Sequence, residues 1–259
     1  QWLCSPALIK QQEDQRKNQF QTIATKMEEL FEGETPWLDS VHSEGDYSLP
    51  GTSDIIFIPY LERMNASLAY YKGFDLRKEH PGINEWFTAL EALEVYRGTQ
   101  GDFHTHAHDL PPQMGGCWVH SNPTQKQFSA AIDSGEGLGG METSFTYKEQ
   151  SNKRNVEFIA LLRVLKHRKT LLAVNPLGEQ AFDQPLRAAL TFMITGKICV
   201  PHQGSASGLR YLRDRISVPR DMPLLPARAL RIALEATAQT DSSKQGPALE
   251  IRNRFDQNP

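Results

Sequence analysis

The segment from residue 51 to residue 73 constrains the fold most, because it combines helix boundary signals with a long apolar run. Asp54 stands at its start, where a carboxylate can accept the unpaired N–H groups of a first helical turn, and Gly73 is a typical helix end. The apolar side chains fall on nearly every side of such a helix, namely Ile55, Ile56, Phe57, Ile58, Tyr60, Leu61, Met64, Leu68 and Tyr71. A helix that is apolar all round is usually buried, so we predict a central core helix.

Pro59 lies inside this run, so it either belongs to the first turn or bends the helix. The six apolar residues from Ile55 to Tyr60 would fit a buried strand equally well. The apolar residues that follow recur three and four positions apart, which favours a helix: Leu61, Met64, Leu68 and Tyr71. We expect Asp54 to be a folding residue, whose replacement by alanine lowers stability on the order of 1 kcal/mol or more.

Composition excludes some classes of protein. A chain of 259 residues can form one large domain or two smaller ones. The net charge of −3 gives no electrostatic case for a nucleic-acid partner. The mean hydropathy of −0.49 is typical of a soluble protein, and no run approaches the ~20 apolar residues of a membrane span.

The three cysteines, Cys4, Cys117 and Cys199, form an odd count without a close pair. This argues against a disulfide framework and favours a reducing compartment. Of the three, only Cys117 is a candidate for a reactive thiol, because histidines lie near it in the sequence. A buried structural thiol is the simpler interpretation. The chain starts at Gln1 without a signal-like segment, which suggests a processed product or a fragment.

Helical periodicity recurs along the chain, and no βαβ alternation is present, so we predict an all-α protein. Its expected parts are a helical bundle over residues 1–98, a histidine-containing loop and glycine-rich linker over residues 99–152, an additional helical region packing on the bundle over residues 153–239, and a flexible tail over residues 240–259. The first helix would bury Phe20, Ile23, Met27, Leu30 and Phe31, the helix opened by Pro81 would bury Ile83, Trp86, Phe87, Leu90 and Leu93, and the helix after Asn155 would bury Phe158, Ile159, Leu162, Leu165 and Leu172.

Two segments, PGTSDIIFIPYLERM and HPGINEWFTALEALEVYRG, resemble the core helix and the next helix of the C-terminal domain of glutathione S-transferases. The resemblance covers roughly Pro6 to Gly98. Two further segments, FHTHAHDLPPQMGG and RYLRDRISVPRDM, are similar to a cyanobacterial and chloroplast subgroup. The resemblance therefore implies a C-terminal-like helical bundle with an additional C-terminal helical region, located in the chloroplast stroma, at the thylakoid or in a cyanobacterial cytoplasm.

The sequence departs from that family in three places. Gly51 stands where the family's capping serine or threonine lies, so Thr52 or Ser53 supplies the hydroxyl or the cap is weaker. Tyr96 and Arg97 lie where many members have an Arg-Pro pair. The N-terminal thioredoxin-like domain, which binds glutathione and supplies the catalytic residue, has no counterpart in these 259 residues.

The resemblance implies that glutathione is the cofactor and that the helical domain lines a pocket for a small hydrophobic electrophile. Such a thiol-conjugating or thiol-reducing enzyme would be active only with an upstream thioredoxin-like domain, so the catalytic residues are unknown and this chain alone is expected to be inactive. The candidate substrate-binding residues are Tyr60, Arg63, Tyr70 and Arg97. Core packing of the tyrosines and an ordinary charge at Arg63 are the alternative interpretations.

The other class of function is a non-catalytic helical module that binds a protein partner in a chloroplast or cyanobacterial assembly, with homodimerisation left open. The basic stretches Lys166–Lys169 and Arg210–Arg215 are explained by solvated helix faces. The alternative is that they dock on an acidic partner or associate peripherally with a membrane surface.

Three histidines alternate in the sequence at His104, His106 and His108, with Asp102 and Asp109 beside them. In an extended strand, alternate side chains share a face, so the three imidazoles could bind one divalent metal. The alternative is that they hydrogen-bond neighbouring helices and order a turn at the two prolines that follow.

Overall fold

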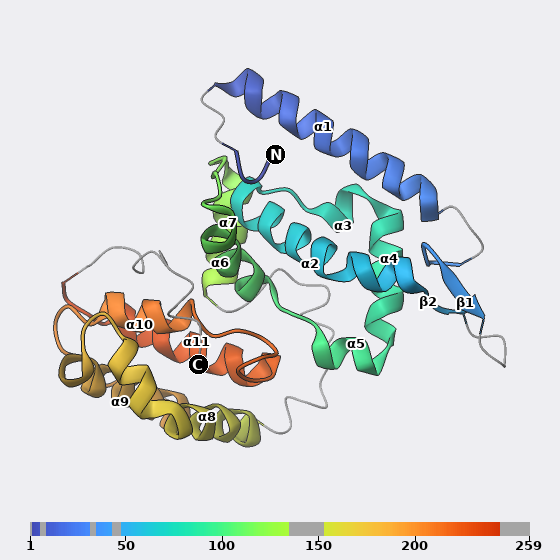
Figure 1. The fold of residues 1–259 in the computed structure, drawn as a ribbon. Coiled ribbons are helices and arrows are strands. Elements are labelled where there is room, and N and C mark those ends of the chain that lie inside the picture. The colour runs from blue at the N-terminus through green and yellow to red at the C-terminus, as the bar shows by residue number, and fades with distance from the viewer. Residues whose placement is uncertain (1, 6–8, 32–34, 43–47, 135–152, 244–259) are drawn as a thin grey trace. The chain divides into compact units, whose positions relative to one another are not determined.

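The computed structural model describes residues 2–5, 9–31, 35–42, 48–134 and 153–243, and it divides the chain into two compact units, Gln1–Ala130 and Ala131–Pro259. Helices dominate both units, which confirms the all-α class (Figure 1). In the described ranges the strands are β1 (Ser40–His42) and β2 (Ser48–Pro50), which pair antiparallel. No described helix is both long enough and apolar enough to cross a membrane.

The helices of the first unit are α1 (Lys10–Glu28), followed by the 3-10 turn η1 (Glu29–Phe31), then α2 (Thr52–Lys72), α3 (Leu76–Glu79), α4 (Pro81–Ala92), α5 (Glu94–Thr99) and α6 (Phe103–Met114). Helix α7 (Pro123–Asp133) begins in the first unit. The second unit contains α8 (Lys153–Val174), α9 (Glu179–Thr195), α10 (Ala206–Arg213) and α11 (Leu224–Gln239).

Helix α2 is the centre of the first unit and packs along α6 (Figure 1). It runs through Pro59 and ends at Gly73, whose φ of 64° is left-handed and suits glycine. Its later turns are buried as predicted, with Leu61 and Leu68 fully enclosed. The core-helix prediction is therefore confirmed for the second half of the segment.

The first half of α2 differs from the prediction. Four of the apolar side chains expected in the core are exposed, with exposed fractions of 43–63%: Ile55, Ile56, Phe57 and Tyr60. The polar contacts between α6 and α2 are made in the later turns, at Glu62 and Tyr71. The prediction of burial is wrong here because an apolar residue on every side does not specify which side a neighbour covers.

Helix α4 begins at Pro81 and buries the predicted face of Ile83, Trp86, Phe87 and Leu90. The predicted face of the first helix is wrong at Ile23 and Leu30, which are exposed, whereas Phe20, Met27 and Phe31 are partly buried. An ion pair between Glu13 and Lys72 of α2 and the packing of Phe20 against Phe74 hold α1 in the first unit.

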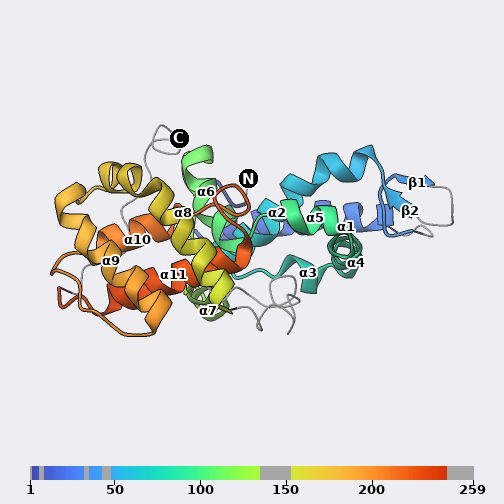
Figure 2. The same cartoon turned by 90° about the horizontal axis from the view of Figure 1, so that it is seen from below.

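In the second unit, α11 contacts α8, α9 and α10 (Figure 2). Helix α9 buries Leu186, Leu190 and Met193. Helix α8 faces the core with Ala160, Val164 and Leu172, one helical turn or two apart. Of its predicted face only Leu172 is buried, while Phe158, Ile159, Leu162 and Leu165 are exposed. The prediction is wrong there because α8 has apolar residues on more than one side.

Asp241, which follows α11, stabilises the start of α10. Its carboxylate accepts hydrogen bonds from the backbone N–H groups of Ser243 (3.0 Å), Ala206 (2.9 Å) and Gly204 (3.1 Å). Burial raises the pKa of Asp241, but these hydrogen bonds outweigh burial and lower the pKa to about 2. The ionised carboxylate therefore stabilises the folded second unit.

We expect Asp241→Asn to destabilise the second unit by roughly 2 kcal/mol at neutral pH, as the lowered pKa implies. Because the folded pKa lies below the ordinary value of 3.8, this contribution is complete above that value and is lost as the pH falls to about 2. Hydrogen-exchange protection of the α10 amides, compared between parent and variant across this range, measures the effect. A difference that stays constant with pH would contradict the assignment.

Candidate functional site

The histidine segment is helix α6, not the predicted extended loop. Asp102 caps the helix by accepting a hydrogen bond from the Thr105 backbone N–H at 2.9 Å, and Gly115 ends it with a φ of 76°. Residues two apart on a helix lie on different faces, whereas residues four apart share a face. His104 and His108 therefore lie together, and His106 points elsewhere.

His104 and His108 form a ring pair with centroids 4.3 Å apart, and the His108 ring also contacts Tyr70 with centroids 5.2 Å apart. Two histidines four residues apart on a helix can ligate one metal, but a protein zinc site uses three or four ligands. The two histidines alone therefore do not complete such a site. The predicted convergence of all three imidazoles is wrong, because it assumed a strand.

His106 instead approaches Glu62 of α2. The His106 Nε2 atom lies 3.3 Å from Glu62 Oε2, and both side chains are largely buried, with exposed fractions of 16% and 9%. Gly101 leaves the room for this imidazole, since a Cβ there would lie 2.5 Å from His106 Nε2. Helix α6 thus places an imidazole against a carboxylate inside the first unit.

Tyr96 of α5 completes this group of polar side chains, which we call the Glu62 cluster (Glu62, Tyr96 and His106). Burial, together with the charge of Glu62 and the hydrogen bond to it, raises the pKa of Tyr96 far above its ordinary value. The Gln100 amide donates a hydrogen bond to the Tyr96 hydroxyl at 3.4 Å. Tyr96 is therefore protonated at any physiological pH and can act as a donor.

The Glu62 cluster has spare hydrogen-bonding capacity. Glu62 Oε1 is buried and has no hydrogen-bond partner among the described residues. Buried polar atoms are normally paired, so such an atom is a candidate acceptor for a ligand. The cluster can thus offer a carboxylate acceptor at Glu62 Oε1, beside an imidazole and a phenol that both contact the same carboxylate.

The sequence did not predict Glu62 or Tyr96 as site residues. Glu62 follows the apolar run of residues 55–61 and precedes Arg63, where the pair of opposite charges is typical of a helix surface. A carboxylate at that place was the one available signal. The neighbours that make Glu62 part of a polar cluster come from α5 and α6, and sequence spacing does not reveal these contacts.

The predicted substrate-binding residues are scattered in the structure. Tyr60 and Arg97 are exposed, on α2 and α5. Arg63 is half-buried, and its Nε atom has no hydrogen-bond partner among the described residues. Tyr70 is half-buried with its ring 4.8 Å from that of Tyr71, which agrees with a packing role.

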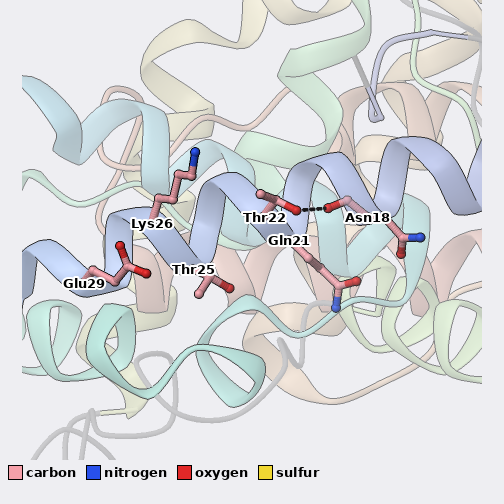
Figure 3. Close-up of a pocket in the computed structure, with 6 residues that line it drawn as sticks. All are labelled: Asn18, Gln21, Thr22, Thr25, Lys26 and Glu29. Atoms are coloured by element: carbon pink, nitrogen blue, oxygen red, sulfur yellow. Dashed lines mark hydrogen bonds between the residues drawn. The ribbon is translucent and has the colours of Figure 1, made fainter.

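A hollow of about 480 Å³ lies along α1 (Figure 3). Its lining side chains are polar and all come from α1 and η1: Asn18, Gln21, Thr22, Thr25, Lys26 and Glu29. Within it, the Thr22 hydroxyl donates a hydrogen bond to the Asn18 backbone carbonyl at 2.9 Å. Small-molecule sites usually enclose a ligand with apolar walls and a few convergent polar groups, so we do not assign a function to this hollow.

Comparisons of the chain with protein-family models, with curated proteins and with solved structures gave no match. Function is therefore inferred from the geometry of the first unit and from the sequence resemblance.

Proposed function

We propose that the first unit is the helical domain of a glutathione S-transferase-like protein. In this proposal it lines the hydrophobic co-substrate pocket of a thiol-conjugating or thiol-reducing enzyme that is active only together with an upstream thioredoxin-like domain. Glutathione would be bound mainly by that other domain, and the electrophile would contact the helices described above.

The supporting observation is the environment of Asp54 at the third position of α2. Its side chain is fully buried and accepts hydrogen bonds from the N-cap Gly51 N–H at 3.0 Å and from Trp86 Nε1 at 2.6 Å. An acidic residue that reaches back to the N-cap N–H is one half of a capping box, and it forms here although glycine replaces the hydroxyl residue. This arrangement links the two segments on which the resemblance rests.

The Glu62 cluster would supply the polar groups of the electrophile pocket. Glu62 Oε1 would accept a hydrogen bond from the electrophile or its leaving group. The protonated Tyr96, which donates its one O–H hydrogen bond to Glu62, would hold that carboxylate in place. His106, which lies beside Glu62, would hold the carboxylate in place. These roles use residues of α2, α5 and α6, the helices around the core of the unit.

Glutathione conjugation tests the proposal. The 259-residue chain and the longest chain that its gene encodes would be measured for binding to immobilised glutathione and for conjugation of a generic aromatic electrophile. We expect the longer chain to be active and the 259-residue chain to be inactive. Inactivity of both would contradict the enzyme proposal.

In the active form, we expect Glu62→Gln to raise the KM for the electrophile about tenfold, the effect of weakening one hydrogen bond to a charged group. The KM for glutathione should not change, because the other domain binds it. Glu94→Gln is the matched control, since Glu94 is exposed on α5. Equal electrophile KM values for the parent and the Glu62 variant would exclude Glu62 from the pocket.

A second function, a non-catalytic protein-interaction module, is favoured by the exposed first half of α2. Ile55, Ile56 and Phe57 are consecutive residues of one helical turn, and their exposed fractions are 60%, 56% and 43%. Exposed apolar patches commonly mark protein contacts. Recovery of a stable partner or a homodimer by the parent, and its loss in Ile56→Asp, would support this function, whereas a lone monomer without a partner would count against it.

A further inference from the structure

Two cysteines that are far apart in the sequence are neighbours in the first unit. The Leu3 carbonyl accepts a hydrogen bond from the Trp118 backbone N–H at 3.0 Å. Cys4 follows Leu3 and Cys117 precedes Trp118, so the two segments bring the cysteines side by side. Both side chains are half-buried, and the Cys4 thiol is within hydrogen-bonding reach of Cys117.

Contacts on each side hold these two segments in place. The Trp2 indole N–H donates to buried Glu13 Oε1 at 2.6 Å, which fixes the segment that carries Cys4. The His120 backbone N–H donates to the Tyr71 carbonyl at 2.8 Å, which fixes the segment that carries Cys117. The proximity of the two thiols is therefore built into the packing around the end of α2.

We propose that Cys4 and Cys117 are a redox pair, which forms a reversible intramolecular disulfide when a small-molecule disulfide such as oxidised glutathione is the oxidant. Cys4 and Cys117 are both free cysteines. Exposed Cys199 lies in the other unit and supplies an internal comparison.

The electrostatics indicate the order of the two exchange steps. Burial, and then the charge and hydrogen bond of Cys4, raise the pKa of Cys117 to about 12, while the Lys72 ammonium opposes this shift. Cys117 is therefore a poor first nucleophile, since the thiolate is the reactive form. The Cys4 thiolate attacks one sulfur of the oxidant, so a Cys4–glutathione mixed disulfide forms and one glutathione thiolate leaves and takes up a proton.

Burial is the main cause of the raised pKa of Cys117; glutathione on Cys4 removes the second cause, the interaction with the Cys4 side chain, while the Lys72 ammonium still favours the Cys117 thiolate. Cys117 then loses its proton to solvent and attacks Cys4 Sγ, and the second glutathione leaves as a thiolate that takes up a proton. In total, two protein thiols are oxidised to one disulfide, and one oxidised glutathione is reduced to two glutathione molecules.

The test uses the full 259-residue chain in buffers of fixed reduced and increasing oxidised glutathione, followed by acid quenching, alkylation of free thiols and peptide mass mapping without reductant. We expect a linked Cys4–Cys117 peptide at a concentration of oxidised glutathione at least about tenfold below that at which Cys199 carries glutathione, because the closing step is intramolecular. Cys199→Ser should leave the linkage unchanged. Cys4→Ser should abolish it and leave Cys117 mainly reduced.

The same chain in concentrated urea provides the control for the fold, and there the preference for the linked peptide should disappear. Persistent glutathione on Cys4 without linkage to Cys117 in the folded chain would overturn the proposal. Linkage only between separate chains, or equal linkage in urea, would overturn it as well.

Discussion

Replacing Asp54 by alanine is expected to lower the free energy of unfolding of the first unit by about 3 kcal/mol or more, well above the loss of a simple helix cap. The carboxylate accepts four hydrogen bonds, from the backbone N–H groups of Leu38 (2.9 Å), Asp39 (3.1 Å) and Gly51 (3.0 Å) and from Trp86 Nε1 (2.6 Å). Alanine leaves all four donors without their acceptor. Each buried donor without a partner costs about 1–3 kcal/mol, and a hydrogen bond to water reduces that cost where water reaches the donor.

Tryptophan fluorescence during urea unfolding reports on this change in the first unit alone, because all four tryptophans lie in it: Trp2, Trp37, Trp86 and Trp118. Asp75→Ala is the matched control, since Asp75 also caps a helix but its side chain accepts one exposed hydrogen bond, from the Lys78 N–H. We expect that control to cost about 1 kcal/mol. A cost for Asp54→Ala no larger than for Asp75→Ala would contradict the role of Asp54 as the link between α2, α4 and the segment before β1.

Buried residues were predicted correctly where a helix has a single apolar face and incorrectly where apolar residues lie on several sides. In α4, the apolar residues Ile83, Trp86 and Leu90 define one face, and that face is buried. In the first half of α2 and in α8, apolar residues occupy several sides, so periodicity does not fix the rotation of the helix about its axis. Side chains such as Ile56 and Leu162 were therefore assigned to the core and are exposed.

The candidate site was less predictable than the helices, for two physical reasons. An H-x-H-x-H spacing shares one face only in a strand, whereas this segment is a helix that starts after Asp102 and includes two consecutive prolines in its last turn. The neighbours of Glu62 come from α5 and α6, and only tertiary packing brings Tyr96 and His106 to it. The same holds for the neighbouring thiols of Cys4 and Cys117.

We expect Lys72→Met to destabilise the first unit by about 3–5 kcal/mol, because it removes one partner of a buried ion pair. Lys72 Nζ lies 3.0 Å from Glu13 Oε1, and the exposed fractions of the two side chains are 0% and 8%. The variant leaves the Glu13 carboxylate buried with the Trp2 indole N–H as its remaining close donor, at 2.6 Å. His120 Nδ1, at 3.9 Å, is too far for a hydrogen bond.

A double-mutant cycle separates the loss of the pair from the cost of an unpaired charge. If the stranded carboxylate causes the destabilisation, adding Glu13→Gln to Lys72→Met should recover a large part of the lost stability, because a neutral amide is less costly to bury and can still accept from Trp2. The exposed pair Arg220 and Asp221 is the control, with an expected coupling below about 1 kcal/mol. Additive effects of the Glu13 and Lys72 replacements would show that α1 is held to α2 by other contacts, and that the ion pair does not anchor it.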